Sequence, residues 1–376
     1  MIGIYLHIPF CKKACSYCNF HFSTNTSRQQ QMVDSLVNEV SERLTIEKME
    51  VDSIYFGGGT PSLLSIDQVN QLLDIIFERA DVSDDVEITF EMNPDDFDAQ
   101  YIRKLSLTKV NRISIGIQSF FDVDLQFMGR AHSAEAAHQS IVMAQEMGFD
   151  KITVDLIYGT PTLTDLNWQQ NLEIVASYRI PHLSCYALTV EDKTELSYQI
   201  QQGKIPPLND DKAAHHFDML SQIAASNGYN QYEISNFCRD EAISHHNSKY
   251  WLGHTYLGFG PSAHSFDGKR RRWNISNNAL YMNYLEKGLP YFEIEHLTEQ
   301  DIYNEMVLTG LRTKWGVTQS MLEQCGAQFL SYFNLQAQEL LANGLLIKDA
   351  SGYTLSHKGK LLSNQVISDL FHVDPM

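Results

Sequence analysis

Short apolar runs alternate with helical segments along the first half of the chain, and this alternation limits the possible folds most. The apolar runs are rich in the branched and aromatic residues that favour β-strands. The expected strands are Ile2–Ile8, Val51–Phe56, Val86–Glu91, Arg112–Gln118, Lys151–Ile157 and His182–Leu188. The expected helices between them are Gln31–Leu44, Ile66–Arg79, Ala99–Leu107, Ala134–Met147 and Leu166–Ser177.

Strands that alternate with helices predict an α/β fold with a parallel sheet and right-handed crossovers. Six such units fit a partial (β/α)6 barrel better than a full barrel of eight. A doubly wound open sheet produces the same alternation, so periodicity alone leaves both architectures open.

The pattern changes after about residue 205. We expect a helix at Asp210–Ser226, a strand at Gln231–Ser235 and then a loop-rich stretch that contains His245 and His246. Three further helices, Glu299–Arg312, Ser320–Cys325 and Tyr332–Asn343, precede a short hairpin, which suggests a mostly helical, winged-helix-like domain. The predicted divisions are a core barrel at 1–205, a connecting region at 206–297 and a C-terminal domain at 298–376.

Charge and hydropathy exclude two classes of partner. The chain of 376 residues has a formal net charge of −18, which argues against binding to a phosphate backbone. The winged-helix-like segment carries five lysine and arginine residues against eight aspartate and glutamate residues, so we expect no DNA binding there. Neither a signal peptide nor a transmembrane stretch is expected, which predicts a cytoplasmic protein.

Cys11, Cys15 and Cys18 form a Cys-x3-Cys-x2-Cys group immediately after the first expected strand. A 4Fe–4S cluster that is fully ligated by protein normally takes four thiolates, so three leave one iron open to a small molecule. This spacing is that of radical SAM enzymes, in which S-adenosylmethionine chelates the open iron. A zinc site completed by His7 or His21 is the alternative, and a disulfide is less expected in a cytosolic chain.

Further polar or glycine-rich groups follow the other strands, where ligands bind in parallel α/β folds. Gly57–Thr60 offers close backbone approach and a hydroxyl, while Glu91 suits an ammonium or ribose hydroxyl. Gln118 and Asp155 suit the ribose diol, and Arg130 suits the carboxylate of S-adenosylmethionine. These loops are expected to converge on one site.

The sequence resembles the radical SAM family that contains the oxygen-independent coproporphyrinogen III dehydrogenases and the haem chaperones. The resemblance runs almost end to end, through Tyr5–Cys11, Phe56–Pro61, Gly116–Phe120, Gly129-Arg130 and Asp155–Gly159. It implies a barrel that holds the cluster and S-adenosylmethionine, followed by a C-terminal helical domain. By this resemblance the cluster and S-adenosylmethionine positions are Tyr5, Cys11, Cys15, Tyr17, Cys18, Gly58, Gly59, Thr60, Glu91, Gln118, Arg130 and Asp155.

Three features favour the chaperone branch of that family. Phe20 stands where the dehydrogenases carry a fourth cysteine, and the chain starts too close to Cys11 for their long N-terminal arm. His246-Asn247-Ser248-Lys249-Tyr250-Trp251 matches the His-Asn-x-x-Tyr-Trp motif of the haem chaperones. The resemblance therefore implies haem binding and delivery to an acceptor protein, with an electron donor for the cluster. The alternative is oxidative decarboxylation of coproporphyrinogen III, so whether the chain is an enzyme stays open.

The haem motif is also consistent with elementary chemistry. A neutral imidazole is a common axial ligand of haem iron, so His246 is the expected ligand and His245 its competitor. Tyr250 and Trp251 suit stacking on a flat macrocycle, and Asn247 belongs to the same motif. The basic run 269–272 is expected to be a solvated loop, with a clamp for haem propionates as the alternative.

Overall fold

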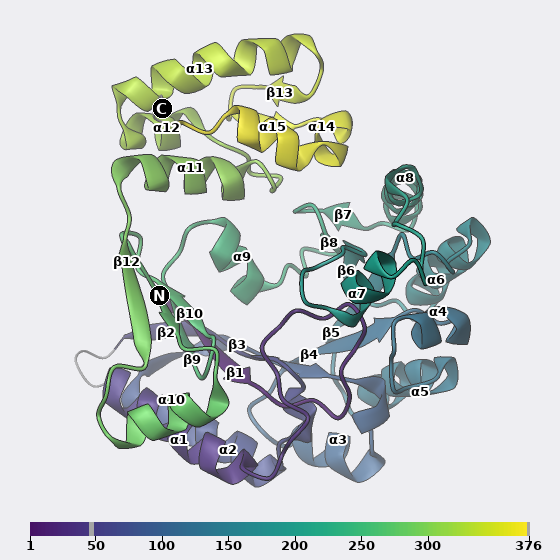
Figure 1. The fold of residues 1–376 in the computed structure, drawn as a ribbon, viewed down its shortest axis with the longest axis vertical. Helices are drawn as coiled ribbons and strands as arrows, with labels where there is room; N and C mark the ends of the chain where they lie inside the picture. The colour runs from purple at the N-terminus through teal and green to yellow at the C-terminus, as the bar shows by residue number, and fades with distance from the viewer. Residues whose placement is uncertain (45–48, 374–376) are drawn as a thin grey trace.

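The computed structural model describes residues 1–44 and 49–373 of the chain. Six parallel strands lie side by side in chain order and curve into a partial barrel (Figure 1). They are β1 (Ile2–Ile8), β2 (Glu50–Gly58), β3 (Asp81–Met92), β4 (Arg112–Gln118), β5 (Lys151–Tyr158) and β6 (His182–Ala187). The expected α/β class and partial (β/α)6 barrel are therefore confirmed.

Helices between these strands cover the outer face of the sheet (Figure 1). They are α1 (Gln29–Arg43), α2 (Ile66–Arg79), α3 (Ala99–Leu105), α4 (Asp122–Phe127), α5 (Ala134–Glu146) and α6 (Asp165–Ser177). The start of α2 illustrates how sequence sets these ends. The Ser65 side chain accepts from the Gln68 backbone N–H, and the Gln68 side chain accepts in return from the Ser65 N–H. This capping box satisfies two otherwise unpaired donors.

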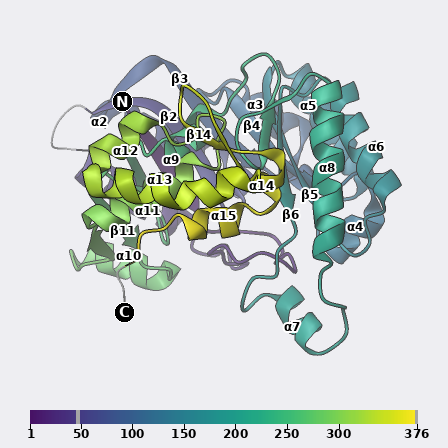
Figure 2. The same cartoon turned by 90° about the horizontal axis from the view of Figure 1, so that it is seen from above.

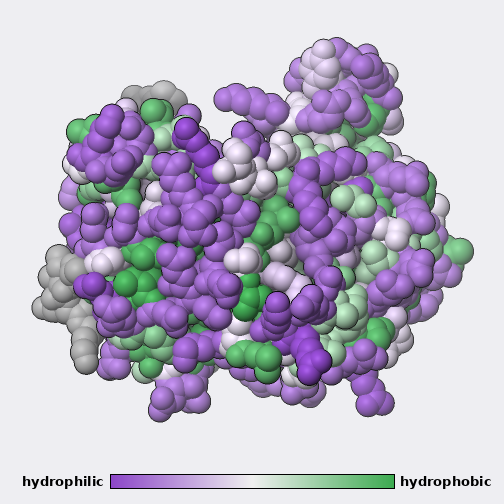
Figure 3. Space-filling view, turned by 90° about the horizontal axis from the view of Figure 1, so that it is seen from below, coloured by the Kyte–Doolittle hydropathy of each residue, from purple (hydrophilic) through white to green (hydrophobic). Residues whose placement is uncertain are grey.

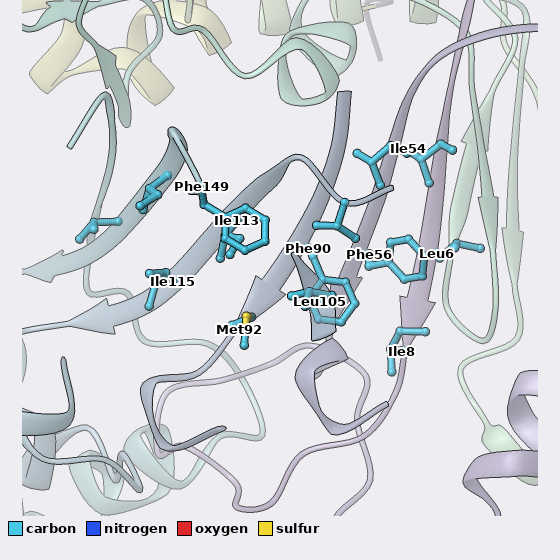
Figure 4. Close-up of a cluster of buried hydrophobic side chains, with 14 of the residues drawn as sticks. Leu6, Ile8, Ile54, Phe56, Phe90, Met92, Leu105, Ile113, Ile115 and Phe149 are labelled. Atoms are coloured by element: carbon cyan, nitrogen blue, oxygen red, sulfur yellow. The ribbon is translucent and has the colours of Figure 1, made fainter. Parts of the chain in front are cut away.

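The main hydrophobic core lies between the sheet and these helices. Phe56 on β2 and Phe90 on β3 are fully buried, with ring centroids 5.4 Å apart. Figure 4 shows them beside Leu6, Ile8, Ile54, Met92, Leu105, Ile113, Ile115 and Phe149. Strands that are buried on both faces read as nearly continuous apolar runs, which is why the sequence revealed all six.

Further strands extend the sheet beyond both sides of the barrel. Beside β1 lie β9 (Tyr256–Phe259), which is parallel to it, and then the antiparallel strands β10 (His264–Phe266), β11 (Arg270–Asn274) and β12 (Phe292–His296). Beyond β6 lie β8 (Asn236–Cys238) and β7 (Asn230–Gln231). The helices of this second half are α7 (Glu195–Gln201), α8 (Asp210–Ser226), α9 (His245–Trp251) and α10 (Asn278–Glu286).

The expected strand at Gln231–Ser235 is wrong. Gln231 ends β7, and residues 232–235 form the turn between β7 and β8, which the Tyr232 N–H closes by donating to the Asn236 carbonyl. The Glu233 carboxylate stabilises the turn further by accepting from the Ser235 N–H at 3.0 Å.

Two other local expectations are also wrong. The stretch around His246 is the helix α9, whose N-cap Ser244 accepts from the Asn247 N–H. The basic run is a strand rather than a loop, since β11 pairs with β10 and β12. The Arg271 guanidinium pairs with Glu295 and Glu305, so a clamp for propionates would have to break existing ion pairs.

The C-terminal segment has its own hydrophobic core around Tyr303 and Phe333. It contains α11 (Glu299–Gly310), α12 (Gln319–Cys325), α13 (Ala327–Ala342), the hairpin β13 (Leu346–Lys348) and β14 (Tyr353–Leu355), α14 (His357–Leu361) and α15 (Ser363–Asp369). These elements lie across the open side of the partial barrel, between the β12 and β7 edges of the sheet (Figures 1 and 2). The Ile234 N–H donates to the Arg312 carbonyl at 3.0 Å, which ties this segment to the turn beside β6.

The surface seen from below is dominated by hydrophilic side chains, with hydrophobic ones in small separate patches (Figure 3). Within residues 1–44 and 49–373, none of the helices has the length and apolar character needed to cross a bilayer.

Candidate functional site

A cavity of about 460 Å³ opens at the carboxyl ends of the parallel strands. Side chains that follow successive parallel strands meet at this end of a barrel, which is why residues far apart in the sequence gather here. The predicted residues that line it are Cys11, Cys15, Tyr17, Cys18, Gly58, Gly59, Thr60, Glu91, Gln118, Arg130, Asp155 and Asn247.

The cysteine loop follows β1 and closes one wall of the cavity. Its course is fixed by backbone hydrogen bonds, since the Ser16 N–H donates to the Met128 carbonyl and the Leu196 N–H donates to the Ser16 carbonyl. Cys11, Cys15 and Cys18 are free, partly buried thiols on this loop. The loop thus presents three sulfurs to one space.

A chain of hydrogen bonds links two of these sulfurs across the cavity. Thr60 Oγ1 lies 3.4 Å from Cys11 Sγ, and Asn93 Nδ2 donates to Thr60 Oγ1 at 3.0 Å. Arg130 Nη2 donates to Asn93 Oδ1 at 2.6 Å, while its Nη1 lies 3.5 Å from Cys15 Sγ. Hydrogen bonds to sulfur stabilise thiolates and tune iron–sulfur clusters. Asn93 was not predicted, because its role depends on neighbours from other strands.

Burial makes the thiols of this loop hard to ionise. It raises the pKa of Cys11 to about 11 and also raises the pKa of Cys18, so positive charge is needed to hold them as thiolates. Within the described ranges, no three histidine, cysteine, aspartate or glutamate side chains gather closely enough to hold one ion. Three thiols on one loop match the number that a 4Fe–4S cluster with one open iron requires.

The glycine run after β2 lets the cavity wall approach the cysteine loop. A Cβ on Gly59 would lie 2.6 Å from the Phe10 carbonyl oxygen and 2.8 Å from that of Ile8. Gly58 has a φ of +106° and would place a Cβ 2.5 Å from the His7 ring. Both positions therefore require glycine on steric grounds.

Two half-buried carboxyl groups, those of Glu91 and Asp155, line the cavity. Burial raises the pKa of Glu91 to about 7, although the Tyr55 hydroxyl, which donates to Oε1 at 2.7 Å, opposes the shift. Burial also raises the pKa of Asp155 to about 6, against hydrogen bonding from hydroxyls such as that of Ser114. Such groups are suited to a ligand that brings a positive charge or hydroxyl donors, because either would stabilise the ionised form.

The half-buried Arg130 side chain supplies positive charge beside the sulfurs. Its Nη2 also donates to the Gly116 carbonyl at 2.8 Å, but its Nε has no hydrogen-bond partner within residues 1–44 and 49–373. Gln118 adopts a left-handed φ of +66° at an irregularity in the β4–β5 register. An outlier of this kind is a frequent feature of ligand sites.

The predicted Tyr5 does not line the cavity. Its ring stacks on Tyr55 with centroids 6.1 Å apart, and it is Tyr55 that lines the cavity at this point. Ser114, Ser184 and Tyr186 also line the wall and were not predicted. The signal that identifies them is alternation along β4 and β6, which places them on the inner face of the sheet.

The haem motif lies on α9, whose Asn247 lines the same cavity. His246 is only 1% exposed, and both ring nitrogens have partners at Ser53 Oγ (3.0 Å) and Tyr250 Oη (2.9 Å). Burial lowers its pKa to about 3, so the ring is neutral. His245 is exposed, with its Nε2 2.9 Å from Asp52 Oδ2.

The aromatic residues of the motif, Tyr250 and Trp251, are half-buried. Tyr250 contacts Tyr256 edge-on at 4.5 Å, and Trp251 ends the helix. Neither of these side chains lines the cofactor cavity. The structure therefore separates the motif into Asn247 in the cavity, an enclosed His246, and a partly exposed aromatic end.

Two protein families match the chain. Residues 5–175 match the Radical SAM superfamily, and residues 297–362 match the HemN C-terminal domain. The first match contains the cysteine loop and the strands that bear the cavity, and the second contains most of the C-terminal core.

Several relatives are similar over nearly their whole length. Heme chaperone HemW of Bacillus subtilis (strain 168) is 34% identical over 374 residues, which cover 97% of this chain and 98% of that protein. Heme chaperone HemW of Lactococcus lactis subsp. lactis is 34% identical, with coverage of 96% and 95%. The mitochondrial radical S-adenosyl methionine domain-containing protein 1 of Mus musculus is 33% identical, with coverage of 98% and 87%.

Among solved structures, coproporphyrinogen III oxidase (HemN) of Escherichia coli has the same fold. Its TM-score is 0.85 at 22% identity, over 98% of this chain and 90% of that one. With the relatives above, these similarities show that the chain belongs to the HemW family of radical SAM proteins.

Proposed function

We propose that this protein is a haem chaperone, which binds haem and transfers it to an acceptor protein. One observation carries the proposal: the His-Asn-x-x-Tyr-Trp helix α9 borders the cavity that contains the three thiols. Its relatives of nearly equal length are named heme chaperones, which supports the same function.

Membership of the radical SAM superfamily implies a 4Fe–4S cluster and S-adenosylmethionine. We propose that Cys11, Cys15 and Cys18 hold the cluster, leaving one iron for S-adenosylmethionine. When bound, the cluster supplies an electron to S-adenosylmethionine, which is the source of radical chemistry. An electron donor is therefore a further proposed partner.

We propose that the remaining cavity residues bind different parts of S-adenosylmethionine. The Arg130 guanidinium is suited to the carboxylate, and the half-buried Glu91 to the ammonium or a ribose hydroxyl. Asp155 and Gln118 are suited to the ribose diol. Backbone at Gly58 and Gly59, the Thr60 hydroxyl and the Tyr17 side chain complete the proposed set, and Tyr5 supports it from behind Tyr55.

We propose that haem contacts the motif residues His246, Asn247, Tyr250 and Trp251, with His245 as the competing iron ligand. In the described conformation His245 is exposed, whereas His246 ligates iron only after its bond to Tyr250 is broken. A haem site at this helix would therefore be accompanied by movement of the His246 ring.

The finer assignments belong to the same proposal. We place the radical SAM core at residues 1–205, the haem-motif region at 206–297 and the C-terminal domain at 298–376. A cytoplasmic location agrees with six free cysteines, since reducing compartments keep thiols unpaired. The acceptor is a protein, and the negative net charge argues against nucleic acid as a partner.

An anaerobic haem titration of the cluster-reconstituted protein, read by Soret absorption, tests the function. Saturable binding of one haem, followed by transfer to an apo-haemoprotein, is expected. Weaker binding in His246→Ala assigns the iron to His246, and weaker binding in His245→Ala assigns it to His245. No specific haem binding by the wild type, together with turnover of coproporphyrinogen III, would instead establish the decarboxylase alternative.

A further inference from the structure

The haem-motif helix and the cofactor cavity share a stack of three rings. Tyr5 and Tyr55 stack with centroids 6.1 Å apart at 27°, and Tyr55 and His246 stack at 5.1 Å and 30°. The middle ring ends in a hydroxyl that donates to Glu91 Oε1 at 2.7 Å. The stack therefore connects β1, β2 and α9 to one carboxylate of the cavity.

The His246 ring, at one end of the stack, is held in place by hydrogen bonds. Ser53 and Tyr250 engage the two nitrogens of His246, so the imidazole has a fixed orientation. The Glu87 carboxylate accepts from the backbone N–H groups of both His245 and His246, at 3.1 and 2.9 Å. These bonds fix the first turn of α9 against β3, so His246 is a fixed surface for Tyr55.

The β2 backbone also lies close to the Tyr55 ring. A Cβ on Gly57 would lie 2.8 Å from Tyr55 Cε1 and 3.1 Å from Glu91 Oε1. Tyr55 is thus packed against Tyr5, His246 and the β2 backbone, and in this position its hydroxyl donates to Glu91.

We infer that Tyr55 and His246 are positioning residues, which together set the place of the Glu91 carboxylate for the ammonium or ribose of S-adenosylmethionine. This inference rests on the proposed function only in assigning Glu91 to that ligand. It gives His246 a second role beside iron ligation. The same imidazole either stacks on Tyr55 or turns toward haem iron, so the S-adenosylmethionine site and the haem site compete for one side chain.

The test compares binding of S-adenosylmethionine, measured across pH, in cluster-reconstituted wild type and variants. Tyr55→Phe removes only the hydroxyl, so we expect about fivefold weaker binding at pH 7, typical of one lost hydrogen bond. We also expect a higher pH at the midpoint of S-adenosylmethionine binding, because the missing Tyr55 hydroxyl normally opposes the upward shift in the pKa of Glu91. The titratable groups that face this carboxyl from other elements are Asp155, Tyr5, Tyr186, Tyr250 and Cys18.

His246 variants separate stacking from iron ligation. His246→Ala is expected to weaken binding of S-adenosylmethionine several-fold, whereas His246→Phe keeps a ring and restores most of it. His254→Ala, exposed just beyond the end of the same helix, is the matched control and should bind S-adenosylmethionine like wild type. Wild-type affinity and pH midpoint in Tyr55→Phe, or equal losses in His246→Ala and His246→Phe, would overturn the inference.

Haem titration of the same proteins keeps the two proposals distinct. If the wild type fails to bind haem but the S-adenosylmethionine results hold, the chaperone function falls and the positioning role stands. If haem binds as proposed but the His246 variants bind S-adenosylmethionine normally, the positioning role falls alone. Failure of the wild type to bind S-adenosylmethionine would overturn the positioning role directly.

Discussion

Asn93 accepts a 2.6 Å hydrogen bond from the Arg130 guanidinium and donates one of 3.0 Å to Thr60. Thr60 and Arg130 in turn lie within hydrogen-bonding distance of the sulfurs of Cys11 and Cys15. One uncharged amide therefore holds together the two groups that touch the thiols. A substitution of Asn93 should therefore disturb both Thr60 and Arg130, and through them the sulfurs.

Replacement of Asn93 by alanine is expected to lower the iron retained after cluster reconstitution and to shift the cluster's midpoint potential. The variant leaves buried donors of Arg130 without a partner, which costs about 1–3 kcal/mol of unfolding free energy. Iron analysis, potentiometry and anaerobic urea unfolding check these effects. Asn19→Ala is the control, because Asn19 lines the same cavity but bonds to Glu191. Wild-type iron content and potential in Asn93→Ala would contradict the prediction.

Stability should fall as pH rises from about 4.5 to about 7 because of Glu91, whose pKa is raised to about 7 by burial. In that window the folded protein retains a proton that the unfolded chain releases, so the contribution to stability is present below the unfolded pKa and is lost as pH rises through the folded value. Glu91→Gln removes this titration and should flatten the pH dependence. The shift from 4.5 to about 7 corresponds to roughly 3 kcal/mol.

Anaerobic urea unfolding at pH 5 and pH 8 measures the effect of Glu91→Gln. The variant should be more stable than wild type at pH 8 and close to it at pH 5. The exposed Glu286→Gln serves as the control and should leave the pH dependence unchanged. A wild-type slope in Glu91→Gln would show that other groups, such as Asp155, dominate this window.

Substitution of Gly59 by alanine should disrupt the cavity wall. The new Cβ would meet two carbonyl oxygens and an amide nitrogen of the cysteine loop within 2.8 Å, and backbone cannot move aside as a flexible side chain can. We expect a loss of more than about 3 kcal/mol in unfolding free energy and poor cluster incorporation. Gly148→Ala is the comparison, because nothing lies within 4 Å of its Cβ and only the left-handed φ of +84° is penalised. Equal losses of unfolding free energy in Gly59→Ala and Gly148→Ala would show that the cavity wall adjusts to the added methyl group, which would contradict the prediction.

Saturating S-adenosylmethionine is expected to change the haem affinity of the wild type several-fold. The reason is linkage, since any coupling of haem to S-adenosylmethionine through the His246 ring acts equally in both directions. Soret titrations with and without S-adenosylmethionine measure the ratio of dissociation constants. That ratio should approach one in His246→Ala, which lacks the shared ring. A ratio of one in the wild type would show independent sites.

The barrel was predictable because its strands are buried on both faces and its helices carry local end signals. β1, β4 and α2 begin and end where the sequence suggested. The turn between β7 and β8 was misread, because Tyr232 is apolar yet is buried through tertiary contacts outside a strand. A local sequence pattern does not distinguish a residue that is buried in a strand from one that tertiary contacts bury in a turn.

The site was predictable in its chemistry but not in its connections. The cysteine spacing indicated the thiol group, yet the bridging role of Asn93 arises from partners that lie 33 and 37 residues away in the chain. Pairing of the basic run with Glu305 likewise depends on a contact between β11 and α11. Such contacts carry no short-range sequence signal, so only the fold reveals them.

The parallel pairing of β1 with β9 has a consequence for biosynthesis. Gly3 pairs with Tyr256, so one edge of β1 has no partner until about 250 further residues have been synthesised. At a synthesis rate of about 5–20 residues per second, that edge stays unpaired for roughly 10–50 s. The unpaired N–H and C=O groups of such an edge can pair with another chain and cause aggregation. The nascent protein would therefore need shielding by the ribosome-associated folding machinery longer than a barrel whose first strand pairs on both sides early.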